Sequence, residues 1–157
     1  MNLQKRSAVR AVILSPDNKV LLARMLYPNT EPLWLTPGGG LEEDEDPVLA
    51  LQRELNEEIF IADWNIGPLV WRREHRLTFN GLDICVDEIF YLIRSVKFDP
   101  PKMMPDENEN QHFHGYRWWD VADIKVSGET FVPLKLASYL PDLINSVIPT
   151  EPIDVGV

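Results

Sequence analysis

A proline and three glycines at residues 37–40 separate a short apolar segment from a longer amphipathic one. Because glycine adopts backbone conformations that other residues avoid, this run predicts a loop. Asp46 and Pro47 then favour the start of a helix, since aspartate accepts hydrogen bonds from the first free amides and proline is tolerated at the first helical position. We expect this helix to run from Pro47 to about Ile59.

The expected helix divides its residues between two faces. At about 100° per residue, the apolar residues fall on one side, which predicts a stripe packed against a sheet. The residues of this stripe are Val48, Leu51, Leu55 and Ile59. Glu54, Glu57 and Glu58 fall on a neighbouring arc, because separations of three and four residues return to the same helical face.

Three carboxylates on one helical face repel one another. Two unit charges about 5–6 Å apart cost on the order of 3 kcal/mol at an effective dielectric constant of about 20. A divalent cation such as magnesium, which carboxylates and substrate phosphates bind, would offset this cost. For a glutamate cluster alone, however, a solvated acidic face with surface pairs to Arg53 is the commoner explanation.

The residues around this helix resemble the Nudix signature, which reads Gly, five residues, Glu, seven residues and then Arg-Glu-aliphatic-x-Glu-Glu-x-Gly-aliphatic. The matching positions are Gly39, Glu45, Arg53, Glu54, Leu55, Glu57, Glu58 and Ile61. Phe60 stands where the family has glycine. A glycine there would end the helix in a left-handed conformation that phenylalanine tolerates poorly, so the sequence does not predict how this helix ends. Matches at fixed spacing are far more specific than a lone glycine motif.

The resemblance covers about residues 8–125 and implies the Nudix fold. This is an α/β (α+β) fold in which a mixed β-sheet is sandwiched between α-helices and the signature forms a loop-helix-loop motif. The resemblance also implies an enzyme that hydrolyses a diphosphate bond in a nucleoside diphosphate linked to another moiety, by attack of water on phosphorus. The alternative is a catalytically silent Nudix-fold module that binds nucleotides, and the complete set of signature carboxylates argues against it.

By resemblance, the cofactor is Mg²⁺, which Mn²⁺ can replace. The residues expected to bind or orient the metal are Glu54, Glu57, Glu58, Glu45 and the backbone of Gly38 or Gly39. Bound cations would neutralise charge in the transition state and lower the pKa of a bound water. We expect Arg53 to pair with a carboxylate and fix its rotamer, a structural more than a catalytic role.

Attack by water needs a general base, and the sequence offers two groups of candidates. One group is Glu54 or Glu58 on the helix, and the other is Glu107 or Glu109 in the acidic, proline-containing segment 100–111. By resemblance, many relatives supply a further acid from such a loop. A solvated, exposed loop accounts for Glu107 and Glu109 equally well.

The segment 71–76 is unusually basic for an acidic chain. On a strand, Arg73 and His75 share one face because side chains alternate, so we predict that they bind substrate phosphates. A charged strand edge that resists aggregation is at least as well supported. Three further residues are expected to be structural: Cys85, in an apolar stretch, and His112 and His114, which lack the spacing of a zinc site.

Apolar runs and turn residues predict the rest of the sheet. The expected strands are residues 8–14, 19–25, 33–36, 67–77, 82–95 and 114–119, and turn residues at 15–18 and 80–81 predict two hairpins. A short turn or helix follows at 121–124. Pro133 opens a last helix that Pro141 would kink.

Length and charge limit the remaining possibilities. With 157 residues, 45% of them hydrophobic, we expect one domain over residues 1–157. The 25 acidic against 15 basic residues give a net charge of −10, which opposes binding of long nucleic acids. We expect a small phosphorylated substrate such as a nucleotide or nucleotide derivative, and a homodimer is possible.

No signal peptide or membrane-length apolar run is evident in the sequence, so a cytoplasmic location is the default.

Overall fold

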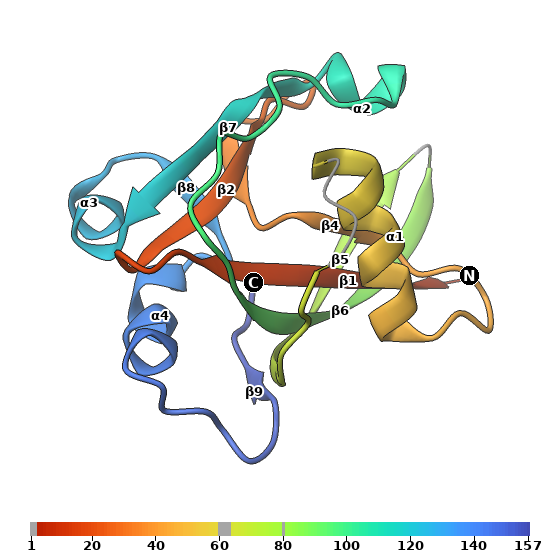
Figure 1. Ribbon diagram of the computed structural model, residues 1–157. Coiled ribbons are helices and arrows are strands. Elements are labelled where there is room, and N and C mark those ends of the chain that lie inside the picture. The colour runs from red at the N-terminus through yellow and green to blue at the C-terminus, as the bar shows by residue number, and fades with distance from the viewer. Residues whose placement is uncertain (1–2, 60–63, 80) are drawn as a thin grey trace.

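The computed structural model describes residues 3–59, 64–79 and 81–157 (Figure 1). The strands in this part of the chain are β1 Gln4–Leu14, β2 Lys19–Met25, β3 Leu33–Leu35, β4 Gly38–Gly40, β5 Leu69–Phe79, β6 Leu82–Arg94, β7 Phe113–Asp120, β8 Thr130–Val132 and β9 Ile153–Asp154. The helices there are α1 Pro47–Ile59, α2 Glu107–Asn110, α3 Val121–Val126 and α4 Leu136–Ile144. None of these described helices is both long enough and apolar enough to cross a bilayer.

The described strands form one nine-stranded mixed sheet with β1 at its centre. The order is β8-β3-β2-β1-β6-β5-β9, with β1 antiparallel to β2 and parallel to β6. β4 also pairs with β1, and β7 pairs with β2. Arg10 of β1 therefore has Gly38 of β4 on one side and Phe90 of β6 on the other.

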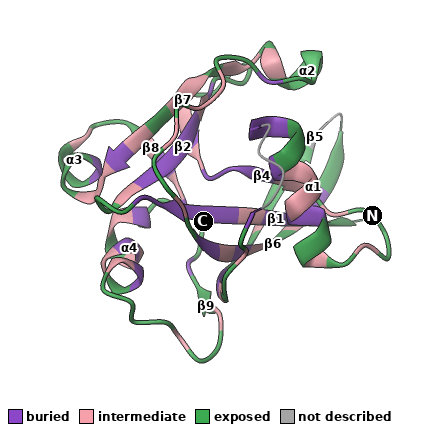
Figure 2. Cartoon of the chain, in the orientation of Figure 1, coloured by how far each residue is buried: buried purple, intermediate pink, exposed green. Residues whose placement is uncertain are grey.

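Side chains of β1 alternate between two hydrophobic cores. The core beneath α1 includes Val9, Ala11, Ile13, Leu51 and Leu55. The core beneath α4 includes Val12, Leu14, Leu136 and Leu140. In Figure 2 the buried residues concentrate along β1 and β2, between the two helices. The predicted mixed sheet between α-helices is confirmed.

Several predicted elements are confirmed. The two hairpins form where β1 meets β2, at Leu14 and Val20, and where β5 meets β6, at Phe79 and Leu82. α1 occupies the predicted range, and α3 follows β7 where a short turn or helix was expected. Phe60, whose effect on the helix end the sequence left open, lies outside the described residues.

The prediction that the glycine run is a loop is wrong, because Gly38–Gly40 forms β4 and pairs with β1. The two backbones approach so closely that a Cβ on Gly38 would collide with the carbonyl oxygen of Val9. Gly38 also has a φ of +143°, which side chains disfavour. The absence of side chains thus permits a strand here.

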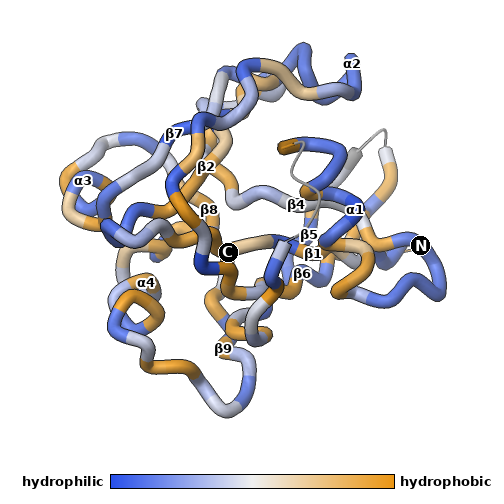
Figure 3. Tube along the Cα trace, in the orientation of Figure 1, coloured by the Kyte–Doolittle hydropathy of each residue, from blue (hydrophilic) through white to orange (hydrophobic). Residues whose placement is uncertain are grey.

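The acidic segment 100–111 is not entirely loop, because it contains α2. Asp106 caps this turn by accepting hydrogen bonds from the amides of Asn108, at 2.8 Å, and Glu109, at 3.3 Å. Figure 3 shows α2 as hydrophilic along its length. A capping aspartate therefore gives Glu109 a defined position that the composition alone did not predict.

Other features of the structure differ from the sequence predictions. The last helix begins at Leu136 and not at Pro133. The short strands β8 and β9 were not expected, because pairing with β3 and β5 defines them.

The buried face of α1 also differs from the predicted stripe, because Val48 is 37% exposed and does not belong to the core. The buried residues of α1 are Ala50, Leu51, Leu55, Glu58 and Ile59. The buried arc is therefore rotated toward Glu58.

Candidate active site

The first turn of α1 is fixed by Asp46. Its Oδ2 accepts hydrogen bonds from the amides of Val48 and Leu49, each at 3.1 Å. Leu51 and Leu55, both fully buried, pack α1 against the sheet. The glutamates of α1 are consequently held in a defined orientation relative to β1 and β4.

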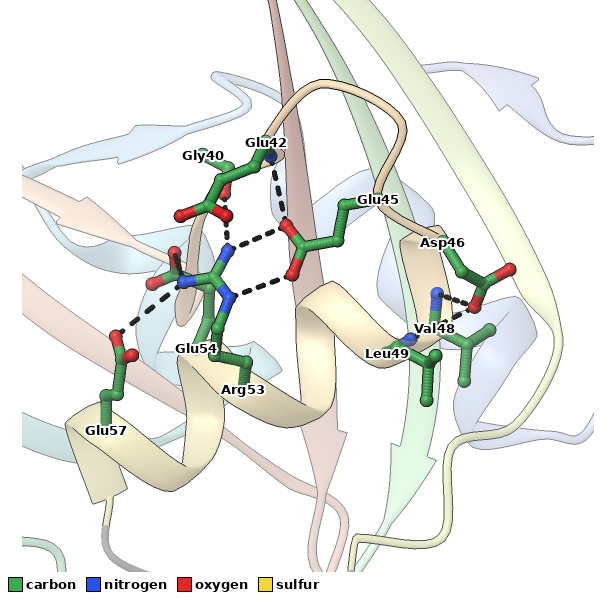
Figure 4. Close-up of polar contacts among 9 residues, drawn as sticks. All are labelled: Gly40, Glu42, Glu45, Asp46, Val48, Leu49, Arg53, Glu54 and Glu57. Carbon is green, nitrogen blue, oxygen red and sulfur yellow. Dashed lines mark hydrogen bonds and ion pairs between the residues drawn. The ribbon is translucent and has the colours of Figure 1, made fainter.

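Arg53 connects the outer side of α1 to the preceding loop (Figure 4). Its Nε and Nη2 donate to the two carboxylate oxygens of Glu45, at 2.8 and 2.9 Å. Nη1 donates to Glu54 at 3.0 Å and lies 3.8 Å from Glu57. The hydrogen bonds from Arg53 hold the pKa of Glu45 at about 2. Glu45 is thus a permanently ionised partner of Arg53 in neutral solution.

Glu54 packs directly against β4. A Cβ on Gly39 would collide with the Glu54 carboxylate, so a side chain at position 39 would displace it. The Glu54 side chain is 13% exposed, and burial raises its pKa although Arg53 acts in the opposite direction. The signature glycine therefore makes room for a signature acid.

Glu58 is the most buried acid of α1, with 5% of the residue exposed. Burial raises the pKa of Glu58 to about 8, and the nearby charges of Glu109 and Glu54 act in the same direction. Arg10 and a hydrogen bond from the Gly38 amide oppose this shift. In contrast, the Glu57 side chain is 57% exposed.

A cleft of about 320 Å³, here called the acidic cleft, brings α1, β4 and α2 together. Glu58 and Glu109 line it from different elements, together with Gly38–Gly40. The pKa of Glu109 is raised by burial and by the charges of Asp106 and Glu57. Glu107 lies outside this lining and faces a separate pocket.

A second cavity of about 520 Å³, here called the side pocket, adjoins the acidic cleft. The two compartments share Arg10, Tyr27, Leu35 and Thr36. The other residues of the side pocket are Thr30, Leu33, Arg73, His75, Leu77, Val86, Glu88, Phe90 and Val132. The side pocket is thus mainly apolar, with one cluster of charged residues.

Glu88 holds this charged cluster together. Its carboxylate accepts hydrogen bonds from Arg10 Nε at 2.8 Å and from Arg73 Nη1 at 2.6 Å, and it lies 3.1 Å from His75 Nε2. Arg73 Nε also donates to the carbonyl of Gly156 at 2.9 Å. Burial alone would raise the pKa of Glu88, but the two arginines outweigh it and lower that pKa. Burial and Arg73 lower the pKa of His75, which favours its neutral form.

The structure brings together part of the predicted site. Glu58, Gly39 and Glu109 line the acidic cleft, and Glu54 packs against Gly39. The predicted acids and arginine outside the described lining of the cleft are Glu45, Arg53, Glu54, Glu57 and Glu107. Arg73 and His75 line the side pocket beside Glu88 of β6, and Arg73 is buried there whereas His75 is partly exposed.

Sequence reasoning missed several residues around these compartments, among them Arg10, Glu88, Tyr27 and His112. Arg10 and Glu88 each interrupt an apolar strand segment, and such an interruption is the signal that was available. His112 was expected to be structural, but it lines the acidic cleft and its ring lies 5.3 Å from that of Tyr27.

The acids beside β4 suit magnesium by their chemistry. Glu54 and Glu58 offer hard oxygen donors, and Mg²⁺ usually takes a few carboxylates together with substrate phosphates. Burial disfavours the ionised form of Glu58, and a nearby cation would favour it. The residues present therefore fit a divalent metal.

A different group has the tightest spacing of potential ligands. Within the described residues, atoms of Glu74, Cys85 and Asp87 all lie within 4.8 Å of one another, a spacing that the α1 acids do not reach. This group lies on the β5–β6 hairpin, and its thiol is buried, as expected for Cys85. The α1 acids would have to move closer together if all of them were to bind one ion.

Comparison with known proteins places these features in a family. The family model described as NUDIX domain matches residues 4–140. An RNA pyrophosphohydrolase from Pelagibacter ubique is 41% identical over 63 residues, which are 40% of this chain and 39% of that protein. One from Marinomonas sp. is 28% identical over 122 residues, covering 72% of this chain and 74% of that protein. The chain thus spans less than half the length of the first of these relatives.

Solved structures show the same fold. The MutT protein from Methanosarcina mazei Go1 has a TM-score of 0.66 at 18% identity, covering 93% of this chain and 97% of that one. The E. coli dihydroneopterin triphosphate pyrophosphohydrolase has a TM-score of 0.63 at 16% identity, covering 92% and 99%. These structures share the fold, and the family match over most of the sequence shows that the chain belongs to the Nudix hydrolase family.

Proposed function

We propose that this chain is a divalent-metal-dependent pyrophosphohydrolase that cleaves a diphosphate bond by attack of water on phosphorus. The observation that carries the proposal is the buried carboxyl group of Glu58 in a cleft that Glu109 also lines and that lies beside Glu54. These acids repel one another when ionised, and a cation would offset that cost. Mg²⁺, with Mn²⁺ as a substitute, suits their oxygen atoms.

Each acid has a separate role in this proposal. Glu54 and Glu58 would hold the metal, assisted by the backbone of β4, and Glu57 stands at the exposed margin of the site. When bound, the metal neutralises phosphate charge and lowers the pKa of a bound water. Arg53 positions Glu54 through the hydrogen bond that joins them, and Glu45 holds Arg53 in place.

We assign the general base to Glu109. A base must face the reacting water without being committed to the metal, and Glu109 lines the acidic cleft from α2 and not from α1. Its raised pKa supports the assignment, because a more basic carboxylate accepts a proton more readily. Glu107 faces a different pocket and is not assigned a role.

The proposed substrate is a small phosphorylated molecule such as a nucleotide derivative. The names of the relatives include RNA pyrophosphohydrolase and dihydroneopterin triphosphate pyrophosphohydrolase, so a triphosphorylated RNA end is the second candidate. The net charge of −10 disfavours contacts along an extended RNA backbone. We further propose that residues 1–157 act as one domain in the cytoplasm, and a homodimer stays open.

A substrate panel tests the proposal. Nucleoside triphosphates, nucleotide sugars, ADP-ribose, dinucleoside polyphosphates and a 5′-triphosphorylated oligonucleotide would each be incubated with Mg²⁺ or Mn²⁺, and phosphate products measured. We expect turnover of at least one small substrate and its loss in excess chelator. Unchanged activity in chelator would refute the metal mechanism. Nucleotide binding without turnover on the whole panel would instead indicate a binding module.

A further inference from the structure

We propose that residues 153–157, here called the docked segment, position the active site from outside the signature helix. The docked segment acts through Arg73, Glu88 and Arg10, whose hydrogen bonds lead from it to β4. This inference rests on the proposed function and adds a determinant of the same site. The family model matches residues 4–140, so the docked segment lies outside the matched domain.

The docked segment is anchored to the rest of the protein at three points. β9 pairs in parallel with β5, and the amide of Val155 donates to the carbonyl of Arg72 at 2.9 Å. The Val155 residue is 3% exposed and belongs to the core beneath α4. The carbonyl of Val157 accepts from the amide of Leu134 at 2.8 Å. Figure 1 shows the chain returning from α4 through β9 toward the sheet. The carbonyl of Gly156 is thus held between two anchored neighbours.

Gly156 in turn fixes the orientation of Arg73. Its carbonyl accepts from Arg73 Nε at 2.9 Å, while Arg73 Nη1 donates to Glu88 at 2.6 Å. The planar guanidinium can satisfy both partners only in one orientation. Arg73 is 8% exposed, so water does not readily replace either partner. The docked segment thereby fixes Arg73 and, through it, the carboxylate of Glu88.

Glu88 holds Arg10 at the edge of the acidic cleft. Arg10 Nε donates to Glu88 at 2.8 Å, and Arg10 Nη1 makes a longer bond to the carbonyl of Gly38, at 3.4 Å. The amide of Gly38 donates to Glu58, so the two peptide groups of one glycine connect Arg10 to a proposed metal ligand. Hydrogen bonds therefore run without a gap from the docked segment to Glu58.

The charges around Arg10 explain why its position matters. Arg10 contacts Glu88 directly and also interacts electrostatically with Glu58 and Glu109 of the acidic cleft. When ionised, these three carboxylates outnumber Arg10 and Arg73. If Glu88 moved away, attraction would draw Arg10 toward the other two acids, where its charge would oppose the binding of a cation. The docked segment therefore keeps the acids of the cleft available to a metal.

Matched substitutions test the docked segment within the 157-residue chain. Val155→Asp places a charge in the core and should release the segment. Val147→Asp is the control, because Val147 is 56% exposed in the connection that precedes the segment. Arg73→Lys keeps the charge beside Glu88 but lacks the fork that also reaches Gly156. Hydrogen exchange, Mn²⁺ binding and steady-state kinetics would be measured at a temperature at which each variant is folded.

We expect Val155→Asp and Arg73→Lys to speed amide exchange in residues 36–41 at least about fivefold relative to residues 113–120 of β7, because β4 loses its support. Both variants should raise the Kd for Mn²⁺ and lower kcat about tenfold, as loss of a partner behind a metal ligand predicts. For Val155→Asp, KM should stay within about twofold of the wild type, because the docked segment lines neither compartment among the described residues. Val147→Asp should match the wild type in every measurement.

A double variant distinguishes positioning from a general loss of stability. If both changes act through the bond between Arg73 and Gly156, Val155→Asp with Arg73→Lys should lower kcat no further than Val155→Asp alone. If Val155→Asp does not fold, Arg73→Lys decides the matter, because it leaves the core beneath α4 intact.

The possible failures are distinguishable. Exchange that rises equally in residues 36–41 and in β7, unchanged Mn²⁺ affinity, or equal effects of Val155→Asp and Val147→Asp would overturn the inference. If exchange and Mn²⁺ affinity change as expected but the wild type hydrolyses no substrate, the proposed function fails and the positioning inference stands.

Discussion

The acidic cleft and the side pocket are assembled in different ways. Most acids beside the cleft come from α1, where helical spacing gathers them before any tertiary contact forms. The charged residues of the side pocket come from β1, β5 and β6 and meet only when these strands pair. The acidic cleft thus depends on residues that are close in sequence, whereas the basic side pocket depends on residues that only strand pairing brings together. Mutations should therefore affect mainly chemistry at the acidic cleft, and mainly folding at the side pocket.

The largest expected effect is on catalysis at the acidic cleft. Glu58→Gln keeps the size of the side chain but removes the charge that would hold the metal, so we expect kcat to fall about 10³-fold or more. Steady-state kinetics on the best substrate of the panel measures this. Glu43→Gln, an exposed change in the preceding loop, serves as the control and should keep full activity. If Glu58→Gln kept a tenth or more of the wild-type activity, the assignment of the acidic cleft as the catalytic site would be contradicted.

At the side pocket, the comparable change should affect folding. Glu88→Gln leaves Arg73 buried without an opposite charge, so we expect the free energy of unfolding to fall by about 3 kcal/mol. Urea denaturation measures this, with the exposed neighbour Asp87→Asn as the control. Replacing both partners, as in Glu88→Leu with Arg73→Met, should recover much of the loss. Equal stability of Glu88→Gln and Asp87→Asn would show that the cluster is not structural.

The two acids of α2 should differ from each other. We expect Glu109→Gln to lower kcat about 100-fold and to change the acidic limb of the pH–rate profile, because the water loses its base. Glu107→Gln, on the same short helix, should change kcat less than about twofold, because Glu107 lies outside the cleft lining. Equal losses of kcat in the two variants would show that the general base does not lie on α2.

The last expected effect is a pH dependence of stability in chelator. The folded state holds a proton on Glu58 up to a pKa of about 8, whereas the unfolded chain releases it near the ordinary glutamate pKa. The folded state thus binds more protons between these values, so the contribution of Glu58 to stability is lost as the pH rises through this window. Between about pH 5 and pH 8, the wild type should lose about 3 kcal/mol more than Glu58→Gln. Parallel urea denaturation series measure the difference, and identical slopes would contradict it.

The contrast between local sequence and strand pairing also explains which features the sequence predicted. The family, the mixed sheet between helices, both hairpins and the range of α1 follow from periodicity, turn residues and one motif of fixed spacing. Apolar positions alone did not predict that the buried arc of α1 includes Glu58 and leaves Val48 exposed. Its orientation depends on how α1 packs on the sheet.

Sheet pairing explains the elements and residues that were missed. β4, β8 and β9 are short and exist through pairing with distant strands, which no local pattern reports. Arg10 and Glu88 are 78 positions apart in sequence and meet because β1 and β6 are parallel neighbours. Arg73 and His75 were identified as one strand face, but the partner that buries them was not.

Direct binding of a divalent ion to the metal-free protein tests the central claim, which is that buried Glu58 and its neighbours form a cation site. Mn²⁺ titration followed by electron paramagnetic resonance would compare the wild type, Glu58→Gln and Glu43→Gln. We predict Mn²⁺ binding by the wild type and Glu43→Gln with similar Kd values, and a Kd at least about tenfold higher for Glu58→Gln. Equal Mn²⁺ affinity in all three proteins would contradict the account.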